Sequence, residues 1–467
     1  MERLNTVPFL LENIELKVIV RKNPVFEATV GIQLKEKVKY RFLRYLLFER
    51  VDEGVLILNL LSRELLFLSN NEIVTLNEIN MLDCNLETYL IENWFLVPQD
   101  FNEYILYNQF FELYRNISKK PLNKYTIITT TDCNARCFYC YQYGVTKFNM
   151  DDSVSNAVAD YIIRKYRGDK IHISWFGGEP LFNALPIDII SNKLLKANVS
   201  FNSSMISNGY LFNHETIKQA VDIWKLRKVQ ITLDGTEKIY NRCKAYIYED
   251  QNPYDRVISN IQELTDNGID VALRLNVGLH NVEDLTKLSG ILATKFKGNR
   301  KIHIYAHLLF ENVGIKPRMN TEEERKFLYD ALYRIEELID NNGLFKVAPL
   351  TNEYKLNACM ADDYSSLVIT PSGNFAKCEN IVDINDLGSV FEDSINYKEI
   401  EMISERVIFS LCENCSILPH CINLKTCPTQ KVECHCREQQ YRINKIKRRM
   451  IKTYEIFLKP QHFTENF

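Results

Sequence analysis

The sequence predicts an α/β protein in which a central strand–helix region lies between an N-terminal α+β region and a cysteine-rich C-terminal region. From about residue 125 to 310, strand-like apolar runs alternate with amphipathic helical segments. An apolar hairpin pattern precedes this region, and eight of the thirteen cysteines follow it, between residues 359 and 436. A chain of 467 residues is long enough for two or three domains with separate cores.

The overall composition argues against nucleic acid and membrane partners. The formal net charge is only −3, which provides no bulk electrostatic attraction to either. Glu12 and Glu15 interrupt the apolar core that a signal peptide would need, and no apolar run reaches the roughly 18 residues of a membrane span. We therefore expect a cytoplasmic protein. Because disulfides rarely persist in that compartment, clustered cysteines there indicate metal binding or catalysis.

The N-terminal region, residues 1–120, contains the pattern YRFLRYLLFERVDEGVLILNLLSRELLFLS. Its turns are expected around 52–54 and 62–64, where polar residues and glycine separate the apolar runs. Two short helices are expected at 71–79 and 86–95. This pattern predicts a small hairpin-and-helix domain.

The central region contains six strand-like runs, which begin near residues 125, 171, 200, 229, 270 and 301. Helix-period segments such as DSVSNAVADYIIRKY and ETIKQAVDIWKL lie between them. This alternation predicts parallel strands with right-handed crossovers, arranged as a partial barrel or as a doubly wound sheet. In both arrangements, ligands gather at the carboxyl ends of the strands.

The first of these strand ends carries three cysteines in a C-x3-C-x2-C spacing. Cys133, Cys137 and Cys140 follow the strand directly, with the aromatic Tyr139 before the third. Such a trio is a disulfide fragment, part of a zinc site or a set of iron–sulfur ligands. Three thiolates cannot complete a tetrahedral zinc site without a fourth ligand, whereas on a four-iron cluster they leave one iron open. The spacing therefore favours an open cluster.

Polar elements follow the next strands in turn. Taken alone, a glycine pair usually forms an ordinary turn, and an arginine usually forms an ordinary ion pair. What indicates a ligand site is that one such polar element follows each strand in turn. The glycines of FGGEP allow close backbone approach, its glutamate offers an acceptor for an ammonium group, and SNG offers small groups suited to ribose hydroxyls. The residues concerned are Gly177, Gly178, Glu179, Pro180, Ser207, Asn208, Asp234, Arg274 and Asn276.

With these motifs, residues 125–310 resemble the core of radical S-adenosylmethionine (SAM) enzymes. The resemblance implies a partial (β/α)6 barrel with one SAM-binding [4Fe–4S] cluster on Cys133, Cys137 and Cys140. It also implies that GGEP receives the amino group of SAM, while SNG and Arg274 hold its ribose and carboxylate. One electron would then split SAM and release a 5′-deoxyadenosyl radical that abstracts a hydrogen from substrate.

The C-terminal cysteines resemble the SPASM extension of this family, although C-x2-C alone is equally typical of a zinc ribbon. The resemblance implies two auxiliary [4Fe–4S] clusters. Cys412, Cys415 and Cys421, with Cys434 or Cys436, would hold one, and Cys359, Cys378 and Cys427 the other. The five-residue gap after Cys421 and the two cysteines at the end, Cys434 and Cys436, depart from the usual pattern. The sequence therefore leaves open whether one auxiliary cluster keeps an iron free for substrate. Glu379, after Cys378, matches an acid that deprotonates substrate in some relatives, and otherwise shields a cluster or faces solvent.

The N-terminal region resembles the winged-helix-like domain that captures leader peptides, most clearly from 38 to 105; the alternative is an ordinary packing domain. We therefore expect a maturase of ribosomally made peptides that acts on leader and core and draws electrons from a flavodoxin or ferredoxin. A thioether crosslink is the first expectation and a carbon–carbon bond its rival. The alternatives are a sulfatase-maturing enzyme, another SPASM dehydrogenase, or a non-catalytic iron–sulfur or zinc protein.

We expect five parts along the chain: an N-terminal leader-recognition-like domain at 1–120, the barrel at 121–320, a helical bridge at 321–358, the domain of the auxiliary clusters at 359–440 and a basic tail at 441–467. The bridge contains a helical stretch near 321–342. Six Lys and Arg residues between 442 and 452 are expected to form a solvated helix face. The isolated Cys84 and Cys243 are expected to be buried small apolar residues.

Overall fold

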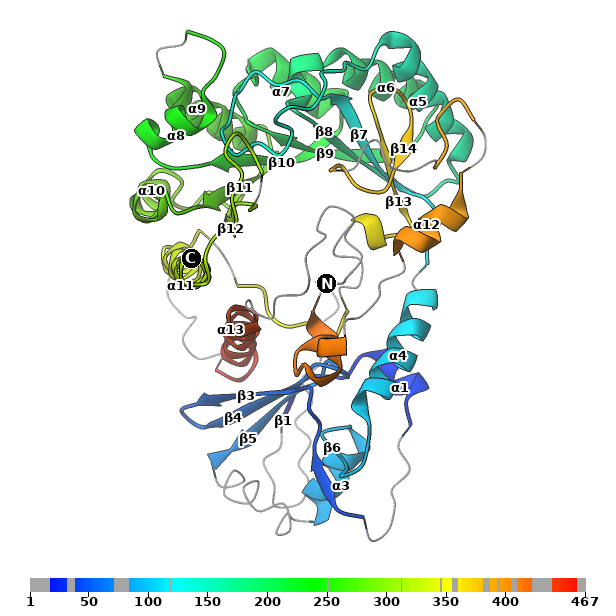
Figure 1. The fold of residues 1–467 in the computed structure, drawn as a ribbon, viewed down its shortest axis with the longest axis vertical. Helices are drawn as coiled ribbons and strands as arrows, with labels where there is room; N and C mark the ends of the chain where they lie inside the picture. Colours follow the sequence, from blue (N-terminus) through cyan, green and yellow to red (C-terminus); the bar gives the residue numbers. More distant parts are fainter. Residues whose placement is uncertain are drawn as a thin grey trace.

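The computed structural model describes residues 17–31, 38–70, 84–117, 119–249, 252–311, 313–344, 347–354, 360–380, 387–392, 395–404, 410–421 and 439–459. Its largest element is an eight-stranded sheet in the order β12-β11-β10-β9-β8-β7-β13-β14 (Figure 1). No helix of these residues is both long and apolar enough to cross a membrane.

Six consecutive strands of this sheet run parallel, which confirms the predicted alternation. They are β7 (Lys124–Thr130), β8 (Ile171–Gly177), β9 (Phe201–Ser207), β10 (Leu226–Leu233), β11 (Asp270–Val277) and β12 (Ile302–Leu308). The C-terminal region extends the sheet past β7, with β13 (Ser366–Ile369) parallel to it and β14 (Phe375–Ala376) antiparallel to β13. The open, curved sheet agrees with a partial barrel.

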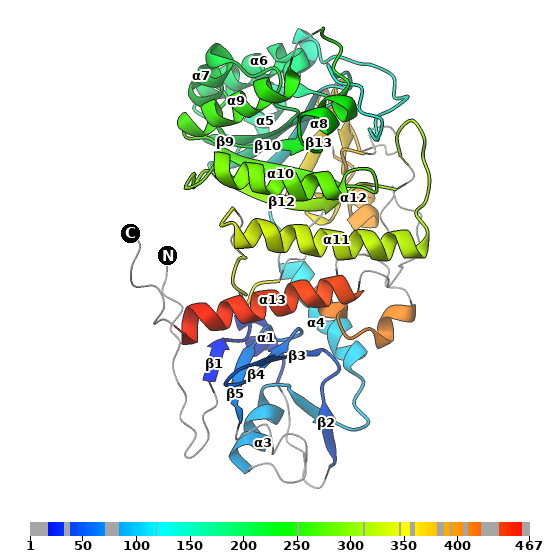
Figure 2. The same ribbon diagram turned by 90° about the vertical axis from the view of Figure 1, so that its left-hand side faces the viewer.

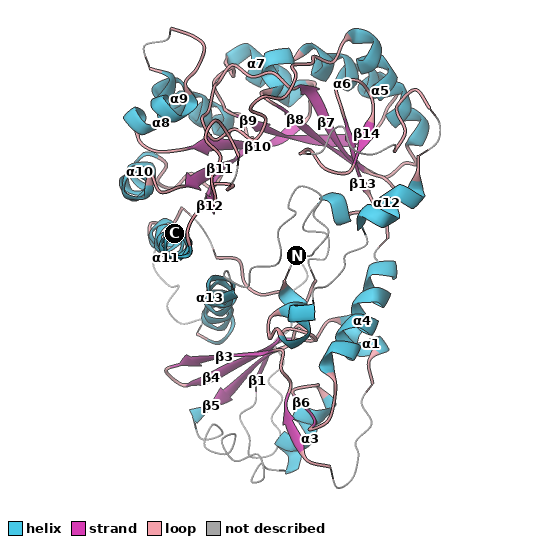
Figure 3. Ribbon diagram, in the orientation of Figure 1, coloured by secondary structure: helices cyan, strands magenta, loops and turns pink. Residues whose placement is uncertain are grey.

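Helices cover the outer face of this sheet (Figure 3). They are α5 (Asp152–Lys165), α6 (Leu185–Lys196), α7 (His214–Asp222), α8 (Glu237–Lys244), α9 (Pro253–Asp266) and α10 (Val282–Lys295), with a 3-10 turn η2 (Pro180–Asn183) after β8. In α5, the Asp151 side chain caps the first turn by accepting from the Val154 N–H, and Val158 and Ile162, four residues apart, are both buried. This apolar face against the sheet is what the helical period predicts.

The N-terminal region forms a second, antiparallel sheet in the order β1-β5-β4-β3. Its strands are β1 (Lys17–Val20), β3 (Leu46–Val51), β4 (Gly54–Asn59) and β5 (Leu65–Ser69), and beside it lie α1 (Pro24–Thr29), α3 (Cys84–Glu92) and α4 (Glu103–Ile117). A separate pair joins β2 (Tyr40–Phe42) to β6 (Leu96–Pro98). Both expected hairpin turns are confirmed.

The two expected N-terminal helices have different outcomes. The helix expected at 71–79 lies outside the described residues. The helix expected at 86–95 is α3, which ends at Glu92 because Trp94 adopts a left-handed φ of 63° and the chain then enters β6.

Two long helices lie between the sheets (Figure 2). The first, α11 (Glu322–Asn341), matches the expected helical bridge and begins with a capping box on Thr321. The second, α13 (Gln439–Leu458), is the basic tail, and it packs against β3, β4 and α11. The expectation of a solvated basic face holds only in part, because three of the six cations pair with acids of neighbouring elements. The pairs are Lys445–Glu336 (2.9 Å), Arg448–Asp340 (2.7 Å) and Lys447–Glu49 (2.9 Å).

The remaining described C-terminal elements are short. They are η3 (Met360–Asp362), α12 (Tyr397–Ser404), η4 (Ser410–Asn414) and η5 (Leu418–His420).

Candidate active site

The three central cysteines lie on one loop at the carboxyl end of β7. The loop is closed at its base, where the Thr131 N–H donates to the Phe148 carbonyl at 2.9 Å and the Thr131 hydroxyl donates to the Thr146 carbonyl at 2.8 Å. Within it, the Cys140 N–H donates to the Cys137 carbonyl at 3.1 Å. The structure therefore places the three cysteines on one folded loop, where Cys137 and Cys140 are near enough to raise the pKa of Cys133; their role as cluster ligands stays a prediction.

One of the three sulfur atoms, Cys133 Sγ, faces donors that suit a thiolate. The Ala135 N–H lies 3.3 Å from Cys133 Sγ, and the amide nitrogen of Asn208, from the end of β9, lies 3.8 Å from the same sulfur. Burial, together with the nearby Glu179 carboxyl and the other two thiols, raises the pKa of Cys133 to about 12. A metal must therefore displace the protons when it binds.

Among the described residues, no group of three or more His, Cys, Asp or Glu is close enough to hold one metal ion. A single ion needs its ligands around one point, whereas cluster cysteines each bind a different iron.

The GGEP segment packs against the start of the cysteine loop. A Cβ on Gly177 would meet the Thr130 carbonyl oxygen at 2.3 Å, and one on Gly178 would meet the Asp132 carbonyl oxygen at 2.1 Å. Gly177 also has a φ of 152°, which other residues rarely adopt. The Gly178 and Glu179 N–H groups donate to the Thr130 and Asp132 carbonyls, each at 3.0 Å. These glycines let two strand ends approach closely.

Glu179 joins the second strand end to the third. Its fully buried carboxylate accepts from the Ser207 hydroxyl at 2.9 Å, the Asn208 N–H at 2.7 Å and the Leu181 N–H at 3.2 Å. Burial raises the pKa of Glu179 to about 7, against the effect of these donors. Glu179 thus positions the SNG segment, and its expected contact with the SAM amino group stays a prediction.

A buried charge network follows the fourth strand. The Asp234 carboxylate accepts from the Tyr139 hydroxyl at 2.7 Å and the Asn276 amide at 3.0 Å, and pairs with the Lys244 ammonium at 3.0 Å. Lys244 also donates to the Tyr139 hydroxyl at 3.1 Å. Three residues predicted from sequence therefore meet here. The sequence interpretation missed Lys244, because nothing in the pattern of α8 marks one lysine among several as buried.

Arg274 lies on β11 and carries a charge that no Asp or Glu of the described residues pairs with. Its Nε donates to Asn276 at 2.9 Å, a terminal nitrogen lies 3.1 Å from His307 Nδ1, and the guanidinium lies 5.8 Å from the Phe310 ring centroid. The alternative of a structural ion pair therefore finds no support, and a guanidinium that no carboxylate of the described residues neutralises suits a carboxylate ligand.

The four described C-terminal cysteines lie in two places. Cys412, Cys415 and Cys421 fall on the η4–η5 turns, where the Cys415 N–H donates to the Cys412 carbonyl at 3.0 Å. These turns contact the N-terminal sheet region, since Arg44 donates to the Glu413 carbonyl at 2.7 Å. The remaining predicted ligands lie outside the described residues; they are Cys359, Cys427, Cys434 and Cys436.

Cys378 and Glu379 belong to the barrel rather than to those turns, because they follow β14. Both lie near Tyr141 of the cysteine loop, whose pKa is raised well above its usual value by burial and then by Glu379, Cys140 and Cys378. Glu379 is half-buried, and burial raises its pKa. The structure thus puts Glu379 beside Tyr141 of the cysteine loop, and its role as an acid that deprotonates substrate stays a prediction.

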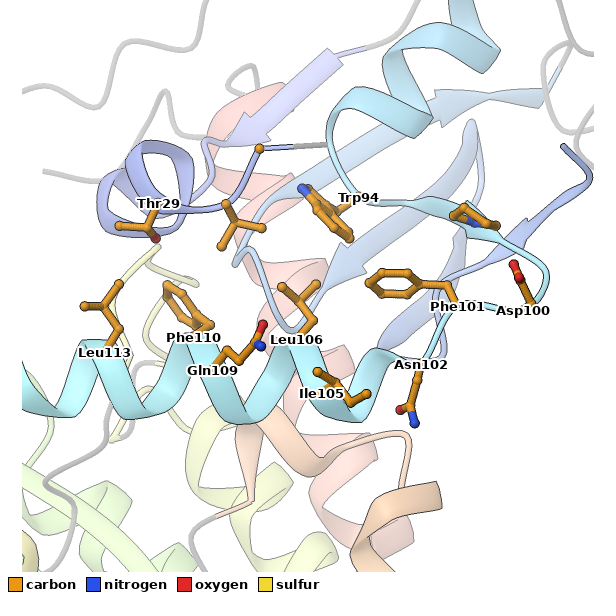
Figure 4. Close-up of a pocket in the computed structure, with 13 residues that line it drawn as sticks. Thr29, Trp94, Asp100, Phe101, Asn102, Ile105, Leu106, Gln109, Phe110 and Leu113 are labelled. Atoms are coloured by element: carbon orange, nitrogen blue, oxygen red, sulfur yellow. The ribbon is translucent and has the colours of Figure 1, made fainter. Parts of the chain in front are cut away.

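A cavity of about 590 Å³ lies away from this site, in the N-terminal region (Figure 4). It opens between α1 and α4, with Trp94, Phe101, Ile105 and Leu113 among its apolar lining residues. None of its lining residues belongs to the cysteine loop, so this cavity takes no part in the site above.

Comparisons with known proteins agree on the central region. Residues 127–288 match the Radical SAM superfamily. A probable GTP 3',8-cyclase of Methanococcus aeolicus is 25% identical over 304 residues, which cover 52% of this chain and 95% of that protein. A second, of Methanococcus vannielii, is 26% identical over 287 residues, which cover 51% and 93%.

Two solved structures share the fold. Native anSMEcpe with bound AdoMet (SAM) has a TM-score of 0.57 at 16% identity, covering 72% of this chain and 100% of that one. Its complex with AdoMet and the Cp18Cys peptide has a TM-score of 0.56 at 15% identity, with the same coverage.

The residues present fit a cluster and SAM. The trio shares one loop, N–H groups face Cys133, and the glycine pair admits no side chain. The buried Nδ2 of Asn134, between Cys133 and Ala135, has no hydrogen-bond partner among the described residues. This arrangement agrees with the match of residues 127–288 to the Radical SAM superfamily.

Proposed function

We propose that this protein is a radical SAM/SPASM maturase that crosslinks a ribosomally made precursor peptide. The observation that carries the radical part is the convergence of three strand ends on the cysteine loop, joined by Glu179 and Asn208. When bound, the cluster and SAM would supply a 5′-deoxyadenosyl radical for hydrogen abstraction at a peptide Cα or Cβ. Cys133, Cys137 and Cys140 would hold the cluster, and Arg274 and the SNG segment would orient SAM.

The peptide substrate is supported by two features. The fold is shared with anSMEcpe, whose structure has been solved with a bound peptide. In the N-terminal sheet, β1 already covers the edge of β5, so β3 is the outer strand on the other side within the described part of the chain. A leader could add to β3 as a further strand, since an unpaired edge offers a row of backbone donors and acceptors.

Crosslinking needs a route for a second electron and a proton. A thioether forms when a substrate thiol loses its hydrogen and the attacked carbon loses another, so two electrons leave in total. The first leaves with the abstracted hydrogen atom. Auxiliary clusters held by Cys378 and by Cys412, Cys415 and Cys421 would take up the second electron, and the Glu379 carboxylate would take up the thiol proton. The raised pKa of that carboxyl makes it a better base than an exposed one.

The test is anaerobic incubation of the iron-loaded protein with SAM, dithionite and each small cysteine-containing peptide that the neighbouring genes encode. We expect a product that has lost two hydrogens, keeps its sulfur and resists thiol alkylation. A product that has lost sulfur and reacts with hydrazide would instead establish the sulfatase-maturing alternative. A carbon–carbon bond would leave the thiol open to alkylation. No peptide change, with deoxyadenosine still formed, would refute the peptide substrate.

A further inference from the structure

Lys244 is a deeply buried cation that contacts the cysteine loop through Tyr139. Its side chain is 5% exposed, and its partner, the Asp234 side chain, is 0% exposed. Burying a charge is costly, and a buried ion pair stabilises a fold less than apolar packing of the same volume often does. A pair in this position therefore calls for an explanation other than stability.

The backbone beside Lys244 is paired with the cysteine loop. The Arg136 N–H donates to the Lys244 carbonyl at 2.9 Å, and the Ile247 N–H donates to the Asn134 carbonyl at 2.9 Å. Cys137 Sγ lies 3.9 Å from the same Lys244 carbonyl oxygen. The end of α8 and the cysteine loop thus form one unit, and any shift of Lys244 moves the loop with it.

The ammonium of Lys244 faces the same loop from within. It donates to the Tyr139 hydroxyl and lies 5.8 Å from the centroids of both the Tyr139 and the Tyr240 rings. The Asp234 carboxylate holds this ammonium in place at 3.0 Å. A buried, paired positive charge therefore contacts Tyr139, which lies in the sequence between the predicted ligands Cys137 and Cys140.

We propose that Lys244 is a positioning residue that sets the reduction potential of the SAM-binding cluster, with Asp234 as its counter-charge. A reduced cluster carries one more negative charge than an oxidised one. A nearby cation therefore stabilises the reduced form, and a nearby anion destabilises it. The pair also fixes Tyr139 before the third cysteine. The inference rests on the cluster of the proposed function and not on its peptide substrate.

The test uses two substitutions that must act in opposite directions. K244Q removes the cation and is expected to shift the midpoint potential of the cluster to a more negative value. D234N removes the anion and is expected to shift it to a more positive value. K244R keeps the charge and is expected to stay closest to the wild type. The measurement is an anaerobic redox titration of the full chain, following the EPR signal of the reduced cluster that changes on adding SAM.

A matched control is K301Q. Lys301 also pairs with an aspartate at 3.0 Å, but this pair is exposed and joins Asp270 at the opposite end of the strands. We expect no shift there. A merely structural role of Lys244 would move K244Q and D234N in the same direction or not at all, and either result would overturn the inference. If K244Q does not load iron, D234N decides alone: a positive shift supports the inference, and an unchanged or more negative potential refutes it. A wild-type protein without a SAM-responsive signal would refute the proposed function itself.

Discussion

The carboxylate of Glu179 offers the sharpest mutational test of how the site is built. It is fully buried, and the three hydrogen bonds it accepts tie the GGEP segment to the end of β9. E179A removes the acceptor from all three donors at once. E179Q preserves the shape but puts an NH2 group where one carboxylate oxygen stood, so at least one donor loses its acceptor.

The expected cost follows from the number of donors. Leaving a buried donor without a partner costs about 1–3 kcal/mol, so three donors cost roughly 3–6 kcal/mol once some water enters. That is a large share of the roughly 5–15 kcal/mol by which a domain is stable. In the barrel, we expect E179A to lower the melting temperature by roughly 10 °C. E179Q lowers the free energy of unfolding by about 1–3 kcal/mol. If that loss comes from disorder of the SNG segment, SAM affinity falls by up to roughly a hundredfold.

The assay is thermal unfolding, with SAM affinity measured by equilibrium dialysis on the iron-loaded protein. The control is E103A, because Glu103 is an equally buried glutamate that binds Arg41 and the Arg44 N–H in the N-terminal region. We expect E103A to lose stability but to keep its SAM affinity. E179A and E179Q proteins with the melting temperature and SAM affinity of the wild type would refute the role of Glu179.

Three further predictions concern other parts of the chain. G178A puts a Cβ 2.1 Å from a carbonyl oxygen of the cysteine loop and should abolish iron loading. The control G290A, which has open space in α10, should load iron normally and raise the free energy of unfolding by up to about 1 kcal/mol. Normal iron loading of G178A would contradict the close approach. Burial raises the pKa of the Glu64 carboxyl to about 7, so its contribution to stability is present below about pH 4.5 and is lost as the pH rises to 7. Urea titrations should therefore find E64Q more stable than the wild type by about 3 kcal/mol above pH 7, and an equal difference at pH 4 would contradict the assignment. Met450 is fully buried in α13, so M450A should lower the free energy of unfolding by about 2–5 kcal/mol. I456A, at an exposed position of the same helix, should lower it by under about 1 kcal/mol, and equal losses would refute the packing of α13.

The barrel could be predicted from sequence because its signal is local and repeated. Each of the six strands is a short apolar run followed by a helix-period segment, and parallel topology then brings their polar ends together. The sequence therefore predicts that Cys133, Gly178, Ser207 and Arg274 lie at one edge of the sheet.

The missed features depend on tertiary contacts. The four-residue β1 forms only because β5 offers an edge to pair with. The helix α13 has a basic sequence that suggests solvent, yet acids of α11 and β3 neutralise its cations and let its apolar side enter the N-terminal core. Lys244 is buried because it pairs with Asp234, ten residues earlier and outside α8, and no periodicity of the sequence predicts that pairing.

The measurement that tests the central claim most directly is deoxyadenosine formation by the anaerobically reconstituted protein with SAM and dithionite. It is compared with a variant in which Cys133, Cys137 and Cys140 are all Ala. We predict that the wild type carries about twelve iron atoms and forms 5′-deoxyadenosine, and that the variant loses about four of the iron atoms and forms none. A fully iron-loaded wild type that forms no 5′-deoxyadenosine would contradict the account.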